Sequence, residues 1–521
     1  MVVRVRFGRP IWIIWACGLV RLLFYASVLP LWEGVDEWSH FAVVRAVALQ
    51  GQLLPAGVTM PRDIEASLNL APVPWEYRRL PAPSLTEDLY WQLPAEARRE
   101  RETSFRAIPA AWALEPASSG WPGYETQQPP LYYWLTAPLV RLMRGRGLAD
   151  QVMAVRWFGV LIASLAIPLV YLIGKQVFGS SAAGYCCAAV LAVMPGFAYT
   201  AAHVGNDGLA VVLFTALIWL GLREERPWLL GIVLGLGLLT KAYFLTAILA
   251  LGWLLVIKRR DPRAALIAGG CALPIAGWWY VRNILTTGTL AGLTESVMIR
   301  PGGAFAVLRA APSIHWIAAI DSVLFPHLYS GGWSWLALRS WMYHLLYAVI
   351  ALAVVGLFRV LRRPEIQWLL AVYLAFWLGL LYHIALLFVT RGVATSMGWY
   401  LYAVAGAEIV LCVAGLRALV PGMQKWVAPG GVVLFAAMDL YAMHAMAIPY
   451  YAGIIRHKPN GALAGLHLAT LPSAGTILER LTAFKANLVS EPLLIVLWLG
   501  YLVLSIAICT IAVSSRYPDL K

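Results

Sequence analysis

Two adjacent carboxylates and a histidine, Asp36, Glu37 and His40, stand in the segment GVDEWSHF (residues 34–41), directly after a long apolar run. A carboxylate at such a place can take a proton from a hydroxyl group, as a general base does. A structural interpretation has equal weight, because Asp36 can cap a helix that runs on to Gly51 while its carboxylate faces water. The spacing of four residues places Asp36 and His40 near one face of that helix.

A second polar motif, YETQQPPLYYWL (residues 124–135), lies about ninety residues further along and carries Glu125 ahead of Pro129 and Pro130. The prolines suit the start of a helix, and the aromatic residues suit a membrane interface. Taken alone, the motif is typical of an interfacial anchor. Glu125 does not fit a purely interfacial anchor, because it places a carboxyl group just before the first turn of a helix, where an active site could use it.

Two cations are candidates for binding an anion such as a phosphate. Lys241 lies in GLGLLTKAYF (residues 235–244) and Arg282 in GWWYVRN (residues 277–283). An arginine can hold two phosphate oxygens with its planar fork, whereas a lysine adds a point charge, so we expect Arg282 to contribute more. Each could instead be a flanking residue whose charged end reaches the membrane surface.

The composition places these residues in a membrane protein, since 61% of the 521 residues are hydrophobic and 13% are charged. Soluble domains carry about 25% charged residues. The net charge of +14 does not indicate nucleic-acid binding, because Lys and Arg fall in short gaps between apolar runs. The cysteines lie in apolar runs too, which indicates neither a disulfide framework nor a zinc site.

The apolar runs predict about twelve transmembrane helices. These runs cover residues 11–31, 154–176, 181–201, 207–222, 227–240, 242–257, 264–284, 340–360, 366–389, 398–419, 430–450 and 491–513. The first is preceded by a basic flank, and we interpret it as a retained transmembrane helix and not as a signal peptide.

The basic gaps predict the orientation of these helices. With both termini in the cytoplasm, nearly all short basic gaps fall on the cytoplasmic side, as the positive-inside rule expects. Three longer segments then lie outside, at residues 33–152, 285–339 and 451–490. The first of them is rich in Pro, Trp and charge, and structureless loops of that length are uncommon, so we expect short interfacial helices within it.

The order DExxHF after the first helix and YExxxPPLYYW before the second resembles the GT-C superfamily of membrane glycosyltransferases. Within it, the sequence is similar to bacterial relatives of protein O-mannosyltransferases and of the aminoarabinose transferase of lipid A. The resemblance continues through HVGNDGL (residues 203–209) and covers residues 1–290 as one module, whereas residues 291–521 fit only as an architecture with two external loops. The superfamily is expected to carry an arginine where this chain has Trp399, so no phosphate contact is assigned there.

This resemblance implies an all-α polytopic fold of the GT-C type with its active site outside the cytoplasm, in the plasma (inner) membrane. It implies an inverting transfer of a sugar from a polyprenyl-phosphate-linked donor to an acceptor that the sequence does not identify, with membrane lipids as further partners. The resemblance implies that Asp36 is the general base, with Glu37 as its substitute, and that Glu125 orients the acceptor or supports a cation. It implies that Lys241 and Arg282 contact the donor phosphate. Supporting roles are implied for His40, Asn206 and Asp207. A divalent cation at the last two is one alternative, and a plain helix cap is the other.

A transporter or lipid flippase is the rival interpretation from another class. Such proteins place charges and broken helices near the middle of the bilayer. Arg21, Glu408 and Asp439 are the candidates for such positions in this sequence, and each is a functional hypothesis by default. The other acids and cations cluster at one predicted water interface, which favours the enzyme.

Overall fold

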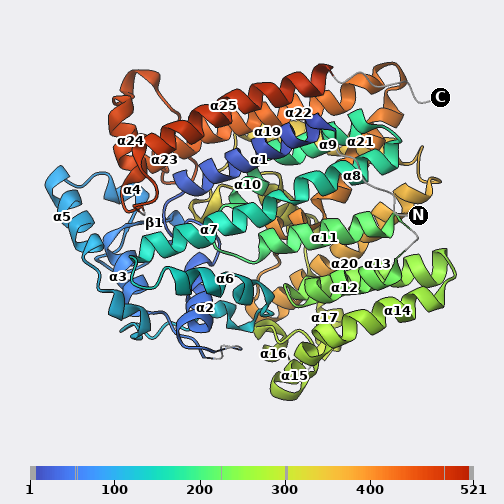
Figure 1. The fold of residues 1–521 in the computed structure, drawn as a ribbon, viewed down its shortest axis with the longest axis horizontal. Coiled ribbons are helices and arrows are strands. Elements are labelled where there is room, and N and C mark those ends of the chain that lie inside the picture. The colour runs from blue at the N-terminus through green and yellow to red at the C-terminus, as the bar shows by residue number, and fades with distance from the viewer. Residues whose placement is uncertain are drawn as a thin grey trace.

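The computed structural model describes residues 8–52, 54, 57–223, 226–299, 303–485 and 487–514. Long helices run side by side along the longest axis of the molecule, and the short helices α3, α4, α5 and α24 gather at one end of the bundle (Figure 1). The predicted all-α polytopic architecture is confirmed.

Eight helical segments of the described chain are long and apolar enough to cross a membrane, or nine if a bent pair is one span. The bent pair turns by 61° where Pro195 begins its second helix, since proline disrupts a continuing helix. These segments comprise α1 (Arg9–Val28), α7 (Leu148–Ser164) with α8 (Ala166–Phe178), the bent pair α9 (Ser181–Val193) and α10 (Pro195–Ala201), α14 (Pro262–Ala272) with α15 (Trp278–Thr287), α19 (Ser340–Leu357), α20 (Pro364–Arg391), η9 (Gly398–Val404) with α21 (Ala405–Leu419), α22 (Gln424–Tyr441) with α23 (Ile448–Tyr451), and α25 (Glu491–Ser514).

Three further predicted runs form apolar helices that are shorter than a typical membrane crossing. They are α11 (Asp207–Gly221), α12 (Pro227–Leu238) and the helix Ala242–Lys258, which contains α13 (Leu245–Gly252). A fourth short apolar helix, α18 (Trp316–Leu328), lies within residues 285–339, where the sequence predicts a loop. Every predicted apolar run is therefore helical, and α18 is an addition.

The segment 33–152 folds into short helices, as expected for a long connection that is not structureless. It buries a second apolar core that includes Trp32, Phe41 and Tyr90. The elements of this segment are α2 (Glu37–Leu49), α3 (Arg62–Leu70), α4 (Glu87–Tyr90), α5 (Ala95–Arg106), α6 (Leu131–Leu142) and a parallel pair of strands, β1 (Pro72–Val73) and β2 (Leu85–Thr86). The later connections add α16 (Thr294–Met298), α17 (Gly303–Ala310) and α24 (Ala474–Thr482).

The first and last long helices pack antiparallel. Phe24 of α1 stacks on Tyr501 of α25 at a ring-centroid distance of 5.4 Å, and Lys485, just before α25, donates to the carbonyl of Val28 at the end of α1 at 3.1 Å. The start of α1 and the end of α25 therefore lie at the same end of the bundle, opposite to α3, α4 and α5 (Figure 1). The division of the chain at residue 290 stays a prediction, and helices from both of its sides pack together.

Basic side chains from the predicted cytoplasmic gaps meet at the end of the bundle where α1 begins. Arg363 donates to the carbonyl of Val177, and Arg359 donates to the carbonyl of Ala418 at 3.0 Å. Both arginines thereby satisfy carbonyls at the carboxyl ends of neighbouring helices, where a positive charge is favourable. The orientation of the bundle in the membrane stays a prediction.

The three ionisable residues expected in mid-membrane have partners. Arg21 of α1 donates from Nε and Nη2 to the Asp439 carboxylate of α22 at 2.6 and 2.5 Å, and Tyr501 donates to the same group at 2.8 Å. The Glu408 carboxylate lies 2.8 Å from His327 Nε2. Arg21 and Asp439 join helices from the two ends of the sequence, and a buried charge needs such a partner.

Candidate active site

Asp36 begins α2 with a left-handed backbone (φ 50°, ψ 21°), and its side chain makes no hydrogen bond to the helix. Of the two interpretations of Asp36, the helix cap is therefore wrong. A capping aspartate needs an extended backbone, whereas the left-handed conformation turns the side chain away from the first helical N–H groups. The side chain is partly exposed, and among the described residues none donates a hydrogen bond to its carboxylate. A non-glycine residue in this conformation is strained, which is common at functional sites.

Glu37 is fully buried and forms a two-point ion pair with Arg156 of α7. Arg156 Nε and Nη2 each lie 2.7 Å from a Glu37 oxygen, and the Val204 N–H donates to Glu37 at 2.9 Å. Burial acts to raise the pKa of Glu37, but the Arg156 guanidinium outweighs it and lowers this pKa. Because its oxygens are engaged and it is inaccessible, Glu37 holds the segment in place, and the structure does not favour it as a substitute base.

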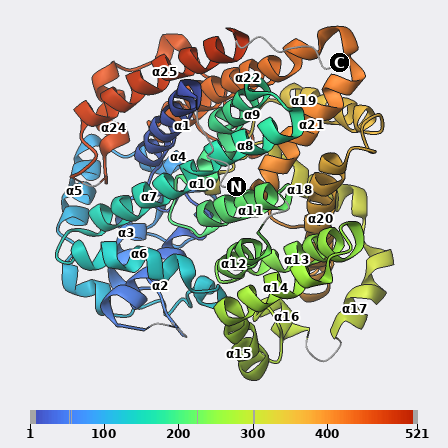
Figure 2. The ribbon, with the colours of Figure 1, turned by 45° about the vertical axis from the view of Figure 1, so that its right-hand side comes forward.

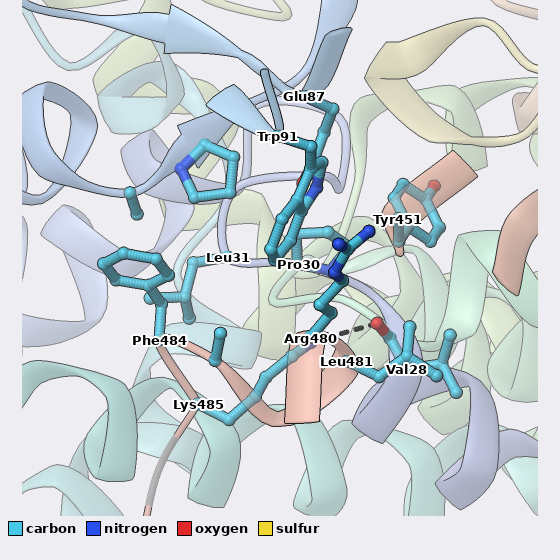
Figure 3. Close-up of a pocket in the computed structure, with 13 residues that line it drawn as sticks. Val28, Pro30, Leu31, Glu87, Trp91, Tyr451, Arg480, Leu481, Phe484 and Lys485 are labelled. Atoms are coloured by element: carbon cyan, nitrogen blue, oxygen red, sulfur yellow. Dashed lines mark hydrogen bonds between the residues drawn. The ribbon is translucent and has the colours of Figure 1, made fainter. Parts of the chain in front are cut away.

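Two cations hold the end of α1, and thereby the segment that follows it. Arg156 Nη1 donates to the carbonyl of Leu29 at 2.9 Å, and Lys485 Nζ donates to the carbonyls of Val28 and Leu29. Terminal carbonyls of a helix have no partner within it and favour positive charge. Lys485 lines the cavity of Figure 3 together with Arg480, which donates to the carbonyl of Ala452 at 2.7 Å.

Glu125 lies against His40 of α2. Glu125 belongs to the short helix η3 (Tyr124–Gln127), is 3% exposed and places its Oε2 3.6 Å from His40 Nε2. The other ring nitrogen of His40 lies 3.0 Å from the hydroxyl of Tyr133, and the Glu125 N–H donates to Ser39 at 3.0 Å. The predicted helix start is present, since α6 begins directly after Pro130.

The surroundings set different protonation states for these groups. Burial, reinforced by Asp36, raises the pKa of Glu125 to about 8, and burial holds the pKa of His40 well below its usual value. Burial raises the pKa of Asp36 only to about 6, because the positive charges of Lys241 and Arg391 oppose it. As the pH rises, Asp36 therefore loses its proton before Glu125 does. Two carboxyls with separated pKa values can divide the roles of base and acid.

Lys241 lies close to these carboxyls and pairs with Asp207. Lys241 Nζ is 2.6 Å from Asp207 Oδ1 and 4.8 Å from the ring centroid of Tyr400. Asn206 donates from Nδ2 to the carbonyl of Thr240 at 2.9 Å, and neither Asn206 nor Asp207 makes a side-chain cap for α11. The pair Asn206 and Asp207 therefore positions the turn that carries Lys241.

A divalent cation does not fit at Asn206 and Asp207. Asp207, one of the two carboxyls expected to support a cation, directs Oδ1 at the Lys241 ammonium. Within the described ranges there is no group of three His, Cys, Asp or Glu side chains that could hold a metal ion.

Arg282 lies apart from the carboxyls. Its guanidinium packs over the ring of Trp279 at 4.9 Å and donates to Asn283 at 3.3 Å, and its side chain is half-buried. Its predicted role at a phosphate stays a prediction. Trp399, where the superfamily is expected to have an arginine, is 9% exposed and lines a cavity of about 20 Å³ beside Glu33 and His203.

Sequence reasoning missed the cation at the end of α20. Arg391 is the last residue of this helix, its charge acts on Asp36, and it pairs with the buried carboxylate of Glu295. One signal was present in the sequence: Arg391 ends a long apolar run whose other end carries the basic gap RVLRRPE. A run that crosses the membrane from that gap must end on the side of Asp36.

The geometry defines a class of protein: a polytopic helical membrane protein with an ionised carboxylate and two cations gathered at one end of its bundle. Residues 127–280 match the model of the dolichyl-phosphate-mannose-protein mannosyltransferase family. This stretch contains Asp207 and Lys241, whereas Asp36 and Arg282 lie outside it. No curated protein matches the chain.

Three solved structures are similar to this chain. ArnT from Cupriavidus metallidurans bound to undecaprenyl phosphate is 14% identical, with 98% of this chain and 78% of that chain covered and a TM-score of 0.47. The apo state of the same protein is 17% identical over 75% of this chain and 67% of that chain, with a TM-score of 0.39. The Archaeoglobus fulgidus oligosaccharyltransferase is 14% identical, with 70% of this chain and 50% of that chain covered and a TM-score of 0.33.

Residues 127–280 are therefore similar to a family of membrane mannosyltransferases, and the helical segments around them are long and apolar enough for a membrane protein.

Proposed function

We propose that this protein is an inverting glycosyltransferase that moves a sugar from a polyprenyl-phosphate-linked donor to a hydroxyl group of an acceptor outside the cytoplasm. One observation carries the proposal: the partly exposed Asp36 carboxylate has no hydrogen-bond donor among the described residues, and the positive charges of Lys241 and Arg391 act on it. A free base beside cations suits a reaction that takes a proton and releases a phosphate.

The transfer is a single displacement. Asp36 takes the proton of the acceptor hydroxyl as its oxygen bonds to the anomeric carbon of the sugar. The bond from that carbon to the donor phosphate breaks on the opposite face, and the electron pair leaves with the polyprenyl phosphate. One displacement inverts the anomeric configuration. Lys241 stabilises the negative charge that grows on the leaving phosphate.

Glu125 supplies a neutral hydrogen-bond donor in this scheme. Its raised pKa keeps it protonated at neutral pH, and it lies against His40, which is neutral for the same reason of burial. A neutral carboxyl group can donate to the acceptor without competing with Asp36 for its proton. Glu125 thus orients the acceptor.

The lipid-linked donor and the cellular location rest on further observations. The matched family is named for a donor in which a sugar is carried on a prenyl phosphate. The basic gaps lie at the end of the bundle opposite to segment 33–152, which supports cytoplasmic termini and an external site in the plasma (inner) membrane.

The direct test uses purified protein in lipid nanodiscs with synthetic polyprenyl-phosphate sugars and a membrane extract as the source of acceptor. Release of polyprenyl phosphate, with transfer of a labelled sugar of inverted configuration, is the expected result. Nucleotide sugars and polyprenyl-diphosphate sugars are the matched negative donors. Transfer from a nucleotide sugar alone, or retention of configuration, would contradict the proposal.

The pH profile of kcat/KM for the donor is expected to be bell-shaped. Activity rises with pH through about 6 as Asp36 loses its proton, and falls above about 8 as Glu125 loses its own. The acidic and the alkaline limb of the profile both belong to the coupled pair of Asp36 and Glu125. A substitution of one carboxyl should therefore also shift the limb that is assigned to the other. Glu125→Gln keeps a hydrogen-bond donor that cannot ionise, so it should remove the alkaline limb. A persisting alkaline limb in this variant would assign that limb to another group.

Lys241→Gln is expected to weaken donor-lipid binding by about 1.5 to 3 kcal/mol, the worth of one charged hydrogen bond. Arg282→Gln should cost less than about 1 kcal/mol, because Arg282 is half-buried against Trp279 and its charge is screened. This order is the reverse of the one expected from the sequence. Titration of each purified variant with donor lipid measures both values. Lys241→Arg, which keeps the pair with Asp207, controls for folding. The reverse order of effects would restore Arg282 as the main phosphate contact.

A further inference from the structure

The start of α16 contacts the chain on both sides of Glu125. The hydroxyl of Tyr124 donates to Glu295 Oε1 at 3.0 Å. The backbone N–H and the hydroxyl of Thr294 both donate to Gln127 Oε1, at 2.6 and 2.9 Å. Helices α15, α16 and α17 lie together at one edge of the molecule (Figure 2). These hydrogen bonds therefore attach α16 to the short helix η3, which carries Glu125.

Glu295 also contacts the cation at the end of α20. Its side chain is 2% exposed and pairs with the guanidinium of Arg391 through Arg391 Nη2, whereas the Arg391 side chain is 46% exposed. A buried carboxylate needs a partner of this kind, because an unpaired one loses its hydration without compensation. The exposed arginine has further N–H groups that the carboxylate does not use, since a guanidinium carries five.

We propose that Glu295 is a positioning residue for the transfer reaction, which orients Arg391 toward the donor phosphate while it holds the segment of Glu125 against the site. The inference rests on the proposed function and names a second cation at the same site.

Geometry and charge support this arrangement. A guanidinium is planar and rigid, so a carboxylate on one edge fixes the direction of the other edge. The charge of Arg391 acts on Asp36, so this arginine is within electrostatic range of the carboxylate that would take the acceptor proton. A phosphate bound between Arg391 and Lys241 would lie beside that base. Among the described residues, Glu295 is linked to the chain around Glu125 through Tyr124 and the neighbouring Thr294. Glu295→Gln keeps an oxygen that can accept from Tyr124, so this variant removes the charge that orients Arg391 while both carboxyls of the site stay in place.

The test is a double-mutant cycle on donor KM and kcat with Glu295→Gln, Arg391→Gln and the double variant. Arg391→Gln should raise donor KM roughly 10- to 100-fold, as expected for a lost charged hydrogen bond. Glu295→Gln should raise donor KM as well, and the double variant should resemble Arg391→Gln alone. Coupling of this kind is what contacting partners show, whereas independent structural effects multiply.

Two controls separate positioning from folding. Glu365→Gln breaks the 3.9 Å pair with Arg363 at the other end of α20 and should leave donor KM unchanged. Arg391→Lys keeps the charge at an exposed position but loses the fork, so it should fold normally and still raise donor KM. Multiplying effects in the double variant, or an unchanged donor KM in Arg391→Gln and Arg391→Lys, would overturn the inference. Absence of any turnover in the wild type would instead contradict the proposed function.

Discussion

Asp36→Asn lowers glycosyl transfer by a factor of about 10² to 10⁴, which is about 3 to 5 kcal/mol of barrier, if Asp36 is the general base. The substitution keeps the size of the side chain and removes its basic group. Asparagine also tolerates the left-handed backbone that position 36 adopts, so the start of α2 is preserved. Transfer rates in nanodiscs, together with donor-lipid affinity, measure the effect.

The donor affinity and melting temperature of Asp36→Asn should stay close to those of the wild type. Asp321→Asn is the matched control, because Asp321 is exposed and hydrogen-bonds to Tyr347 at 2.8 Å in another part of the molecule. A fully active Asp36→Asn enzyme would exclude Asp36 as the base. Glu37 and Asp207 could not simply replace it, because each is buried and paired with a cation.

Glu37→Gln lowers the free energy of unfolding by about 3 to 5 kcal/mol, the usual cost of removing one partner from a buried ion pair. The variant leaves the fully buried Arg156 guanidinium without its counter-charge. Arg156→Met should be at least as damaging, since it also removes the donors to the carbonyls of Ala26, Leu29 and Pro30. Thermal or denaturant unfolding in detergent measures both.

An exposed ion pair of similar length provides the control for Glu37. Arg62 and Glu115 lie 2.6 Å apart with side chains 46% and 45% exposed. Glu115→Gln should therefore change stability by about 0 to 1 kcal/mol. If Glu37→Gln were as stable as Glu115→Gln but inactive, Glu37 would have a chemical role and not a structural one.

The sequence predicted the helices well because membrane helices leave a long apolar signal. It also placed Asp36, Glu125, Asp207 and Lys241 near one end of the bundle, since helix ends on one side of a membrane must meet there. The orientation of the Asp36 side chain could not be predicted, because residue type favours a cap and only the backbone angles exclude it.

The partners of the buried charges were not predictable from local patterns. Arg156 lies within an apolar run and finds Glu37 across 119 positions of sequence, and Arg391 finds Glu295 across 96. Nothing near either residue in the sequence distinguishes a paired arginine from one that reaches the membrane surface. The helix α18 was missed for a related reason, since its apolar run is shorter than a membrane crossing.

The ion pair between Arg21 and Asp439 has a consequence for how the protein is made. The two residues are separated by 418 positions in the sequence. At a chain growth of about 5 to 20 residues per second, Asp439 is synthesised roughly 20 to 80 s after Arg21. An arginine in the middle of a membrane helix costs about 2.5 to 3.5 kcal/mol on insertion scales. An unpaired Arg21 therefore weakens the insertion of the first helix during biogenesis, and this cost is offset only after α22 has been synthesised and Asp439 has paired with Arg21.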